Sequence, residues 1–332
     1  MAEPMNLLTD IEGVAVGHAT DLALGSGVTA IVFDEPAIAS GSVLGGAPGG
    51  RDTALLDPSM TVQTVDAFVL SGGSAFGLDA AGGVQSGLRE IGRGFQVGSV
   101  RVPIVPQAIL MDLLNGGDKD WGLHSPYRDM GYEAFGAAAK GPFALGTVGA
   151  GTGATTATFK GGIGSASART SSGHWVAALM AANALGSATI GEGPHFWASP
   201  FEENQEFGGL GLPPAFDNRM RLKGRNVTST TIGVIVTDAV LTKAQAHRLS
   251  ILAHDGLARA ILPAHLPFDG DTIFSAATGA KPLNDPADFM EICHLATLVT
   301  ARAVARGVYE ATALPVANAQ AAWRDRFTSP AR

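Results

Sequence analysis

The sequence has 332 residues, of which 46% are hydrophobic and 16% charged, so it can bury a large core and lacks the composition of a disordered chain. Its formal net charge is −8 and it has no basic run, which argues against nucleic acid as a partner. The single cysteine, Cys293, excludes a disulfide within one chain, and its apolar surroundings predict a core position. We therefore expect one globular domain over residues 1–332.

The start of the chain and its most apolar stretch are not typical of a secreted or membrane protein. Residues 1–8 lack the positive n-region and the apolar h-region of a secretory signal, which predicts a cytoplasmic protein with no membrane partner. Residues 175–190 are interrupted by Asn183 and Gly186 and fall short of the roughly 20 apolar residues that span a bilayer. We interpret this stretch as a buried helix.

Predicted strands and helices alternate along the chain. The β-branched runs that predict strands are residues 27–33, 66–70, 230–237 and 272–277. The spacing of apolar residues predicts helices over residues 131–139, about 242–261 and 288–311. A further helix is expected after the glycine turn at residues 71–73, with Ser74 as its cap, and Thr242 or Asp238 can cap the helix near residue 242.

Residues 191–225 differ from the rest of the chain, because they contain four prolines and show little periodicity. We interpret this segment as an exposed, mobile connection. It runs directly into the predicted strand that begins near Ser229, Thr230 and Thr231.

Several common catalytic and cofactor signatures are absent from the sequence. There is no G-x-S-x-G nucleophile elbow, no H-E-x-x-H zinc helix and no G-x-x-x-x-G-K-[ST] phosphate loop. The glycines at residues 149–153 lack the spacing of a dinucleotide fingerprint, so no cofactor is expected. The eight histidines show no metal-ligand spacing. His265 and Asp269 can share a site, but a structural role is the ordinary interpretation, and no metal is expected.

Thr230 is a candidate nucleophile because it lies where the proline-rich segment meets a strand. If the peptide bond before it were broken, one residue would carry a hydroxyl and a free α-amino group, whose pKa near 7.7 suits a general base. The alternative is that these residues simply open a β-strand, in which threonine is common.

Four other polar residues interrupt apolar or glycine-rich surroundings. Asp269 and Asp271 flank a glycine just before a strand and can turn toward one point, although a solvated turn is the alternative. Lys160 stands in an almost uncharged region and requires a carboxylate partner unless it lies at a loop edge. Asn183 interrupts an apolar run, where its amide either bonds the core backbone or donates to an oxyanion.

Together these features resemble the DmpA-type aminopeptidase family, also called the S58 peptidases, which includes β-peptidyl aminopeptidases and nylon-oligomer hydrolases. The matching motifs cover nearly the whole chain and lie at residues 9–18, 70–79, 102–106, 159–164, 230–234, 253–261 and 268–272. The resemblance implies an α/β fold in the form of a four-layer αββα sandwich, similar to that of ornithine acetyltransferase relatives. It also implies a precursor that cleaves itself into a large subunit, residues 1–229, and a small subunit, residues 230–332.

By this resemblance Thr230 is the nucleophile and Asp269 and Asp271 are its acidic partners. Lys160 matches the family's lysine near the nucleophile, and Asn183 matches the amide of the oxyanion hole. These residues make up the implied catalytic set.

The chain departs from the family pattern at two places. Met111 stands where relatives often carry an aromatic hydroxyl, which puts the second oxyanion donor and some substrate preference in doubt. Ser229 stands where asparagine or glycine is common before the nucleophile, and a register one residue earlier would make Ser229 the nucleophile. The loop of Gly72, Gly73 and Ser74 is expected to line the substrate pocket, together with Met111.

The implied activity is hydrolysis of amide bonds in small peptides or amino-acid amides through an acyl-enzyme on Thr230. A 6-aminohexanoate (nylon) oligomer hydrolase is the alternative within the family, and an ornithine acetyltransferase-like acyltransferase is a more distant one. A non-enzymatic binding protein on the same fold is expected to stay uncut. The expected assembly is a homo-oligomer of cleaved two-subunit protomers.

Overall fold

The computed structural model describes residues 3–224 and 229–328, and in this part of the chain nine strands join in one hydrogen-bonded sheet. The strand order is β3-β7-β4-β2-β11-β10-β9-β8, and β1 pairs with β2 beside that path. The strands are β1 (Val14–Asp21), β2 (Ser26–Val43), β3 (Gly50–Arg51), β4 (Thr64–Ser71), β7 (Gln107–Ile109), β8 (Ile163–Arg169), β9 (Trp175–Ala181), β10 (Ile232–Ala239) and β11 (Thr272–Lys281). A separate hairpin is formed by β5 (Phe95–Val97) and β6 (Val100–Val102).

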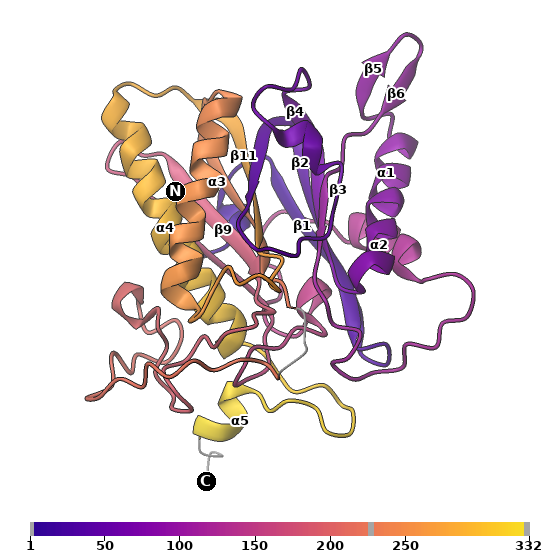
Figure 1. Cartoon of the computed structure of the whole chain (residues 1–332). Coiled ribbons are helices and arrows are strands. Elements are labelled where there is room, and N and C mark those ends of the chain that lie inside the picture. The colour runs from indigo at the N-terminus through magenta and orange to yellow at the C-terminus, as the bar shows by residue number, and fades with distance from the viewer. Residues whose placement is uncertain (1–2, 225–228, 329–332) are drawn as a thin grey trace.

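Two pairs of helices enclose the strands from opposite sides (Figure 1). The α-helices are α1 (Ala80–Glu90), α2 (Tyr127–Gly136), α3 (Lys243–Ala260), α4 (Pro286–Tyr309) and the short α5 (Trp323–Phe327). One core lies between the pair α1 and α2 and strands β2 and β4, and a second lies between the pair α3 and α4 and strands β8 to β11. A third core lies between the two groups of strands.

The strand β2 joins the two groups of strands. Its first half pairs with β1 and β4, whereas residues from Ile38 onward pair with β11, and the register shifts between Val32 and Ala37. Phe68 on β4 and Phe274 on β11 stack across the middle core with ring centroids 4.8 Å apart. The predicted four-layer αββα arrangement is thus confirmed, with both strand layers hydrogen-bonded through one long strand.

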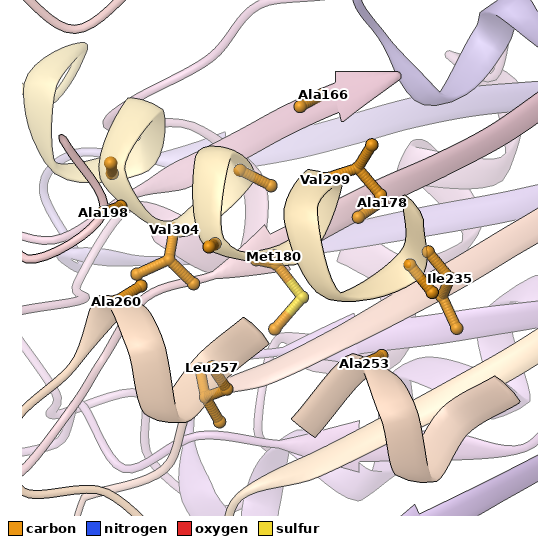
Figure 2. Close-up of a cluster of buried hydrophobic side chains, with 14 of the residues drawn as sticks. Ala166, Ala178, Met180, Ala198, Ile235, Ala253, Leu257, Ala260, Val299 and Val304 are labelled. Carbon is orange, nitrogen blue, oxygen red and sulfur yellow. The ribbon is translucent and has the colours of Figure 1, made fainter. Parts of the chain in front are cut away.

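Successive side chains along a central strand point to opposite faces of the sheet and fill different cores. Ile235 on β10 packs in the cluster with α3 and α4, while Val234 and Val236 face the middle core. Figure 2 shows the first of these clusters, in which Val299 and Val304 of α4 belong to the same core as Met180 of β9. Burial of both faces stabilises these strands mainly through the hydrophobic effect.

The prediction of a helix over residues 175–190 is wrong. Residues 175–181 form strand β9, which pairs antiparallel with β8 and β10. Met180 packs toward the helices and Leu179 toward the middle core, so both faces require apolar residues. A strand buried on both faces produces the same continuous apolar run as a buried helix, and periodicity does not separate the two.

The other predicted strands and helices are confirmed as to type, with shifts in their bounds. Strands β4 and β11 contain the predicted runs, β10 begins at Ile232 instead of residue 230, and β2 continues to Val43 instead of ending at residue 33. Helices α2, α3 and α4 overlap the predicted helices. Thr242 caps α3 by accepting a hydrogen bond from the Gln245 N–H, as expected. Ser74 does not cap a helix through its side chain. It has a φ of 52° and begins the 3-10 turn Ser74–Asp79 that precedes α1.

The prediction that residues 191–225 are exposed is wrong for the aromatic part of the segment. Phe196 and Phe207 are buried, and the Phe196 ring stacks on Trp323 of α5 with centroids 5.6 Å apart. Cys293 on α4 is half-buried beside the same core instead of filling it. The segment has little regular structure, yet its aromatic side chains anchor it to the helices.

Candidate active site

The start of β10 places the Ser229–Thr230 peptide bond between its two neighbouring strands. Ile232 pairs with Ala181 of β9 on one side and with Thr272 of β11 on the other. The pairing continues before the strand, because the Thr230 N–H donates to the Asn183 carbonyl at 2.9 Å. On the other side the Ser229 N–H donates to the Phe268 carbonyl at 3.2 Å. The backbone around this bond is therefore fixed from both sides.

Two donors converge on the carbonyl oxygen of Ser229. The Thr230 hydroxyl donates to it at 2.5 Å, and the Gly270 N–H donates to it at 2.9 Å. A Cβ on Gly270 would lie only 2.7 Å from the Thr230 Oγ1, so only glycine allows this approach. The arrangement places a hydroxyl beside the carbonyl it would attack, and an N–H where negative charge would develop on the oxygen.

The two predicted acidic partners flank Gly270 and lie at the same site. Asp271 accepts from the Thr231 N–H at 2.9 Å, and Asp269 accepts from the Leu185 N–H at 3.3 Å. Both side chains are buried. Burial, together with the charge of Asp271, raises the pKa of Asp269 to about 7.

His265 pairs with Asp271, whose Oδ2 receives both the histidine N–H and the ring Nδ1 at 2.9 Å. Burial alone would lower the pKa of His265, but the hydrogen bond and the charge of Asp271 outweigh it, so the pKa is raised. The sequence indicated His265 and Asp269 as a possible pair, whereas the hydrogen-bonded carboxylate is that of Asp271. Thr231 and His265 thus hold the Asp271 carboxylate in place.

Lys160 is fully buried before β8, and its ammonium donates to the carbonyls of Gly151 at 2.9 Å and Gly161 at 2.7 Å. The expectation of a carboxylate partner is wrong: no ion pair to Lys160 exists among the described residues. Glycine turns leave their carbonyls open, and these replace the carboxylate as acceptors. Burial, with the nearby charge of Lys223, lowers the pKa of Lys160 to about 7.

Asn183 follows β9 and connects the candidate nucleophile to a neighbouring loop. Its backbone carbonyl accepts from Thr230, and its Nδ2 donates to the Met111 carbonyl at 3.0 Å. Its Oδ1 accepts from the Thr155 N–H at 3.0 Å and from the Lys223 ammonium at 2.9 Å. Asn115 Nδ2 also donates to this oxygen at 3.4 Å, so four partners fix the orientation of the amide, and Met111 contributes to the site through its backbone.

The glycine loop after β4 reaches the site through Asp112, a residue that the sequence analysis missed. The Gly73 N–H donates to Asp112 Oδ1 at 2.7 Å, and a Cβ on Gly72 would lie 2.1 Å from Asp112 Oδ2. The Ser74 N–H donates to the carbonyl of Leu110 at 3.0 Å. Burial raises the pKa of Asp112. A single carboxylate within the apolar run 108–114 is the signal in the sequence that marked this residue.

Lys223 was also missed, because the segment that carries it was interpreted as a mere connection. The side chain extends into the site, where its ammonium reaches Asn183 and, at 3.3 Å, the Thr155 carbonyl. No pattern in the sequence marks this lysine apart from its position shortly before Thr230.

The described residues contain neither a cluster of metal ligands nor a helix that could span a membrane. No group of three or more histidine, cysteine, aspartate or glutamate side chains could hold a metal ion there. In the same part of the chain no helix has the length and apolar character needed to cross a membrane.

Relatives of known sequence align over most of the chain. Residues 6–322 match the family described as Peptidase family S58. An uncharacterized aminopeptidase of Mycobacterium bovis is 41% identical over 354 aligned residues, which cover 97% of this chain and 98% of the relative. An uncharacterized aminopeptidase of Mycobacterium leprae is 40% identical over 309 residues, which cover 87% of this chain and 83% of the relative.

Solved structures share the fold at lower identity. A beta-aminopeptidase of Burkholderia sp. aligns with a TM-score of 0.72 at 22% identity, covering 98% of this chain and 92% of that one. An L-aminopeptidase D-Ala-esterase/amidase of Ochrobactrum anthropi, described as a variant of the Ntn hydrolase fold, aligns with a TM-score of 0.67 at 19% identity and covers 94% of this chain and 88% of that one. The sequence matches extend over the strands and loops that build the site around Thr230, and on their strength the protein belongs to peptidase family S58.

Proposed function

We propose that the chain is a self-processing amidohydrolase that cleaves its own Ser229–Thr230 bond and then uses Thr230 as an N-terminal nucleophile. The observation that carries this proposal is the Ser229 carbonyl, whose oxygen accepts from both the Thr230 hydroxyl at 2.5 Å and the Gly270 N–H at 2.9 Å. Thr230 is buried, and adjacent strands fix its backbone, so the hydroxyl has little freedom to leave the carbonyl.

In the self-cleavage step the Thr230 Oγ1 attacks the carbonyl carbon of Ser229. The Gly270 N–H stabilises the oxyanion that forms, the bond from carbon to the Thr230 nitrogen breaks, and that nitrogen takes up the proton. An ester between Ser229 and the threonine hydroxyl results. Water hydrolyses it and leaves residues 230–332 with a free α-amino group on Thr230.

In turnover the Thr230 hydroxyl attacks a substrate amide while its own α-amino group accepts the proton. This nitrogen lies 2.9 Å from the Asn183 carbonyl, which would orient the amine. Asp271 holds the neighbouring Thr231 N–H, and Asp269 and Lys160 place further charges near the site, each with a pKa of about 7. Water then hydrolyses the acyl-enzyme.

The substrates that we propose are small peptides and amino-acid amides with a free amino terminus. Relatives named as aminopeptidases, at about 40% identity over most of the chain, support this class. The beta-aminopeptidase of Burkholderia sp. shares the fold and directs the first substrate panel toward both α- and β-aminoacyl amides.

Intact mass spectrometry of the denatured protein tests the proposal. We expect two fragments, the smaller beginning at Thr230, and release of amine from aminoacyl amides. The variant Thr230→Ala should remain one chain and lose at least about a thousandfold in hydrolysis, because it lacks the nucleophile.

Ser229→Ala is the matched control. The Ser229 hydroxyl is buried and has no hydrogen-bond partner, so its loss should leave both cleavage and turnover in place. A Thr230→Ala protein that still cleaves, or a Ser229→Ala protein that does not, would move the nucleophile to Ser229.

A further inference from the structure

The side chain of Lys223 enters the candidate active site from the segment that precedes the nucleophile. Its ammonium donates to Asn183 Oδ1 at 2.9 Å and to the Thr155 carbonyl at 3.3 Å. The backbone carbonyl of Asn183 also accepts a hydrogen bond from the Thr230 N–H. Asn183 therefore contacts both the Lys223 ammonium and the candidate nucleophile. Lys223 belongs to the part of the chain that self-cleavage would separate from Thr230.

Neutral acceptors and carboxylates surround this ammonium, although a second buried ammonium, that of Lys160, is also close enough to repel it. Asn183 Oδ1 and the Thr155 carbonyl are both acceptors, and the carboxylates of Asp112 and Asp269 lie close enough to favour the charged form of Lys223. Burial acts in the opposite direction and lowers the pKa of Lys223 to about 7.

The site continues into a cleft of about 320 Å³ that is open to solvent. Lys223 forms part of its wall, together with Asn115, Thr155, Asn318 and Gln320. These neighbours are polar and none carries a charge, so Lys223 supplies the only positive charge among the residues that line the cleft. A small ligand can enter here once the lysine side chain is withdrawn.

We propose that Lys223 occupies, as an internal ligand, the subsite that receives the primary ammonium group of a substrate. In the uncut chain the tether holds the lysine at a high effective concentration, so it competes with any free amine. After cleavage the lysine lies near a free chain end and a substrate amine can displace it. The inference rests on the proposed amidohydrolase function and names the group that its substrates present to this subsite.

The first test measures binding in the inactive Thr230→Ala background, where no ligand is consumed. Alaninamide, an α-amine, and 6-aminohexanamide, an ω-amine, are titrated by calorimetry against the chain with Lys223 and against the Lys223→Ala variant. Removal of the lysine side chain opens the subsite, so we expect at least about a tenfold gain in affinity for one of the amines. The amine that gains identifies the α- or ω-amino source of the ammonium.

Three controls separate an ammonium subsite from a structural lysine. Lys223→Met fills the space without charge and should leave binding weak, and N-acetylalaninamide should bind to none of the variants. Lys243 is a matched buried lysine that donates to the Leu55 and Val62 carbonyls, so Lys243→Met should leave amine binding unchanged. If Lys223→Ala does not fold, Lys223→Ser, which also removes the ammonium and most of the side chain, carries the same measurement.

Equal affinity with and without the Lys223 side chain would overturn the inference, as would binding of the acetylated amide. Failure of the proposed function has a different signature: the wild-type chain would stay uncut and would release no amine. The binding measurement uses a chain that cannot cleave, so the two results are independent.

Discussion

The strand ends around Thr230 and the segment of residues 191–224 reach the same site, but continuous strand pairing holds the first, whereas scattered contacts hold the second. Around Thr230 the contacts are backbone hydrogen bonds to Asn183 and, through Ser229, to Phe268 and Gly270. The segment has almost no regular structure, and it is held by buried side chains, such as Phe196, and by isolated backbone hydrogen bonds, such as the one from the Lys223 N–H to the Leu185 carbonyl at 2.9 Å. The strand ends hold the Ser229–Thr230 peptide bond in place. The segment carries Lys223, the internal ligand that we propose.

This difference suits the two roles that the proposed self-cleavage would require. Attack on a carbonyl requires atoms held to within a fraction of an ångström, which paired strands provide. Under our proposal the segment would yield its place to a substrate after cleavage, and scattered contacts suit this role, since each can be released separately.

The variant Gly270→Ala disturbs the strand ends around Thr230 most directly. A Cβ would lie 2.7 Å from both Thr230 Oγ1 and the Ala47 carbonyl, so the N–H must move away from the Ser229 oxygen. Loss of one oxyanion donor costs about a hundredfold to a thousandfold in rate, or about 3 to 4 kcal/mol. We expect a folded and largely uncut chain in time-resolved mass spectrometry. Rapid, complete cleavage would show that the Gly270 N–H is dispensable.

The variant Phe196→Ala tests how the segment of residues 191–224 is attached to the rest of the molecule. Phe196 contacts the rings of Phe207 and Trp323 and is buried, so its truncation should lower the free energy of unfolding by about 3 kcal/mol. Cleavage should still reach completion, because no strand contact of Thr230 changes. Urea denaturation and intact mass measure the two effects. A stable variant that fails to cleave would show that the aromatic anchor aligns the bond.

Sequence reasoning predicted the residues around Thr230 better than the contacts of the segment of residues 191–224. Resemblance identified Thr230, Asn183, Asp269 and Asp271, and the structure brings these four together, since all lie where strands β9, β10 and β11 begin or end. Their roles in catalysis stay predictions. Periodicity failed at β9, whose two buried faces give the apolar run of a helix.

The contacts that sequence reasoning missed come from long-range packing. Lys223 and Asn183 are distant in sequence and meet only through the path of an irregular segment, which no local pattern encodes. Asp112 reaches Gly73 and Ser26 through the same kind of contact. Lys160 obtained carbonyl partners from glycine turns whose geometry depends on the tertiary fold.

Asp269 makes the stability of the strand ends around Thr230 depend on pH, and the variant Asp269→Asn tests this. The pKa of Asp269 is raised from 3.8 to about 7, so between these values the unfolded chain has lost a proton that the folded chain keeps. Stability from this group is therefore present below pH 4 and is lost as the pH rises toward 7. From pH 5 to 6.5 the loss is about 2 kcal/mol. Urea denaturation in the Thr230→Ala background should show that loss, and Asp269→Asn should remove it. An unchanged slope would place the proton elsewhere.

Thr242→Ala has the smallest expected effect and lies outside both regions. Thr242 caps α3 by accepting from the Gln245 N–H, and its loss costs about 1 kcal/mol of stability. Helix α3 packs on β2 and β11, so the change reaches the site only as a general loss of stability. Cleavage and turnover at 25 °C should equal those of the wild type. Slower cleavage by Thr242→Ala would show that the strand ends around Thr230 respond to global stability. The rate loss of Gly270→Ala would then have to be corrected for the stability that this variant loses before the remainder is assigned to the missing oxyanion donor.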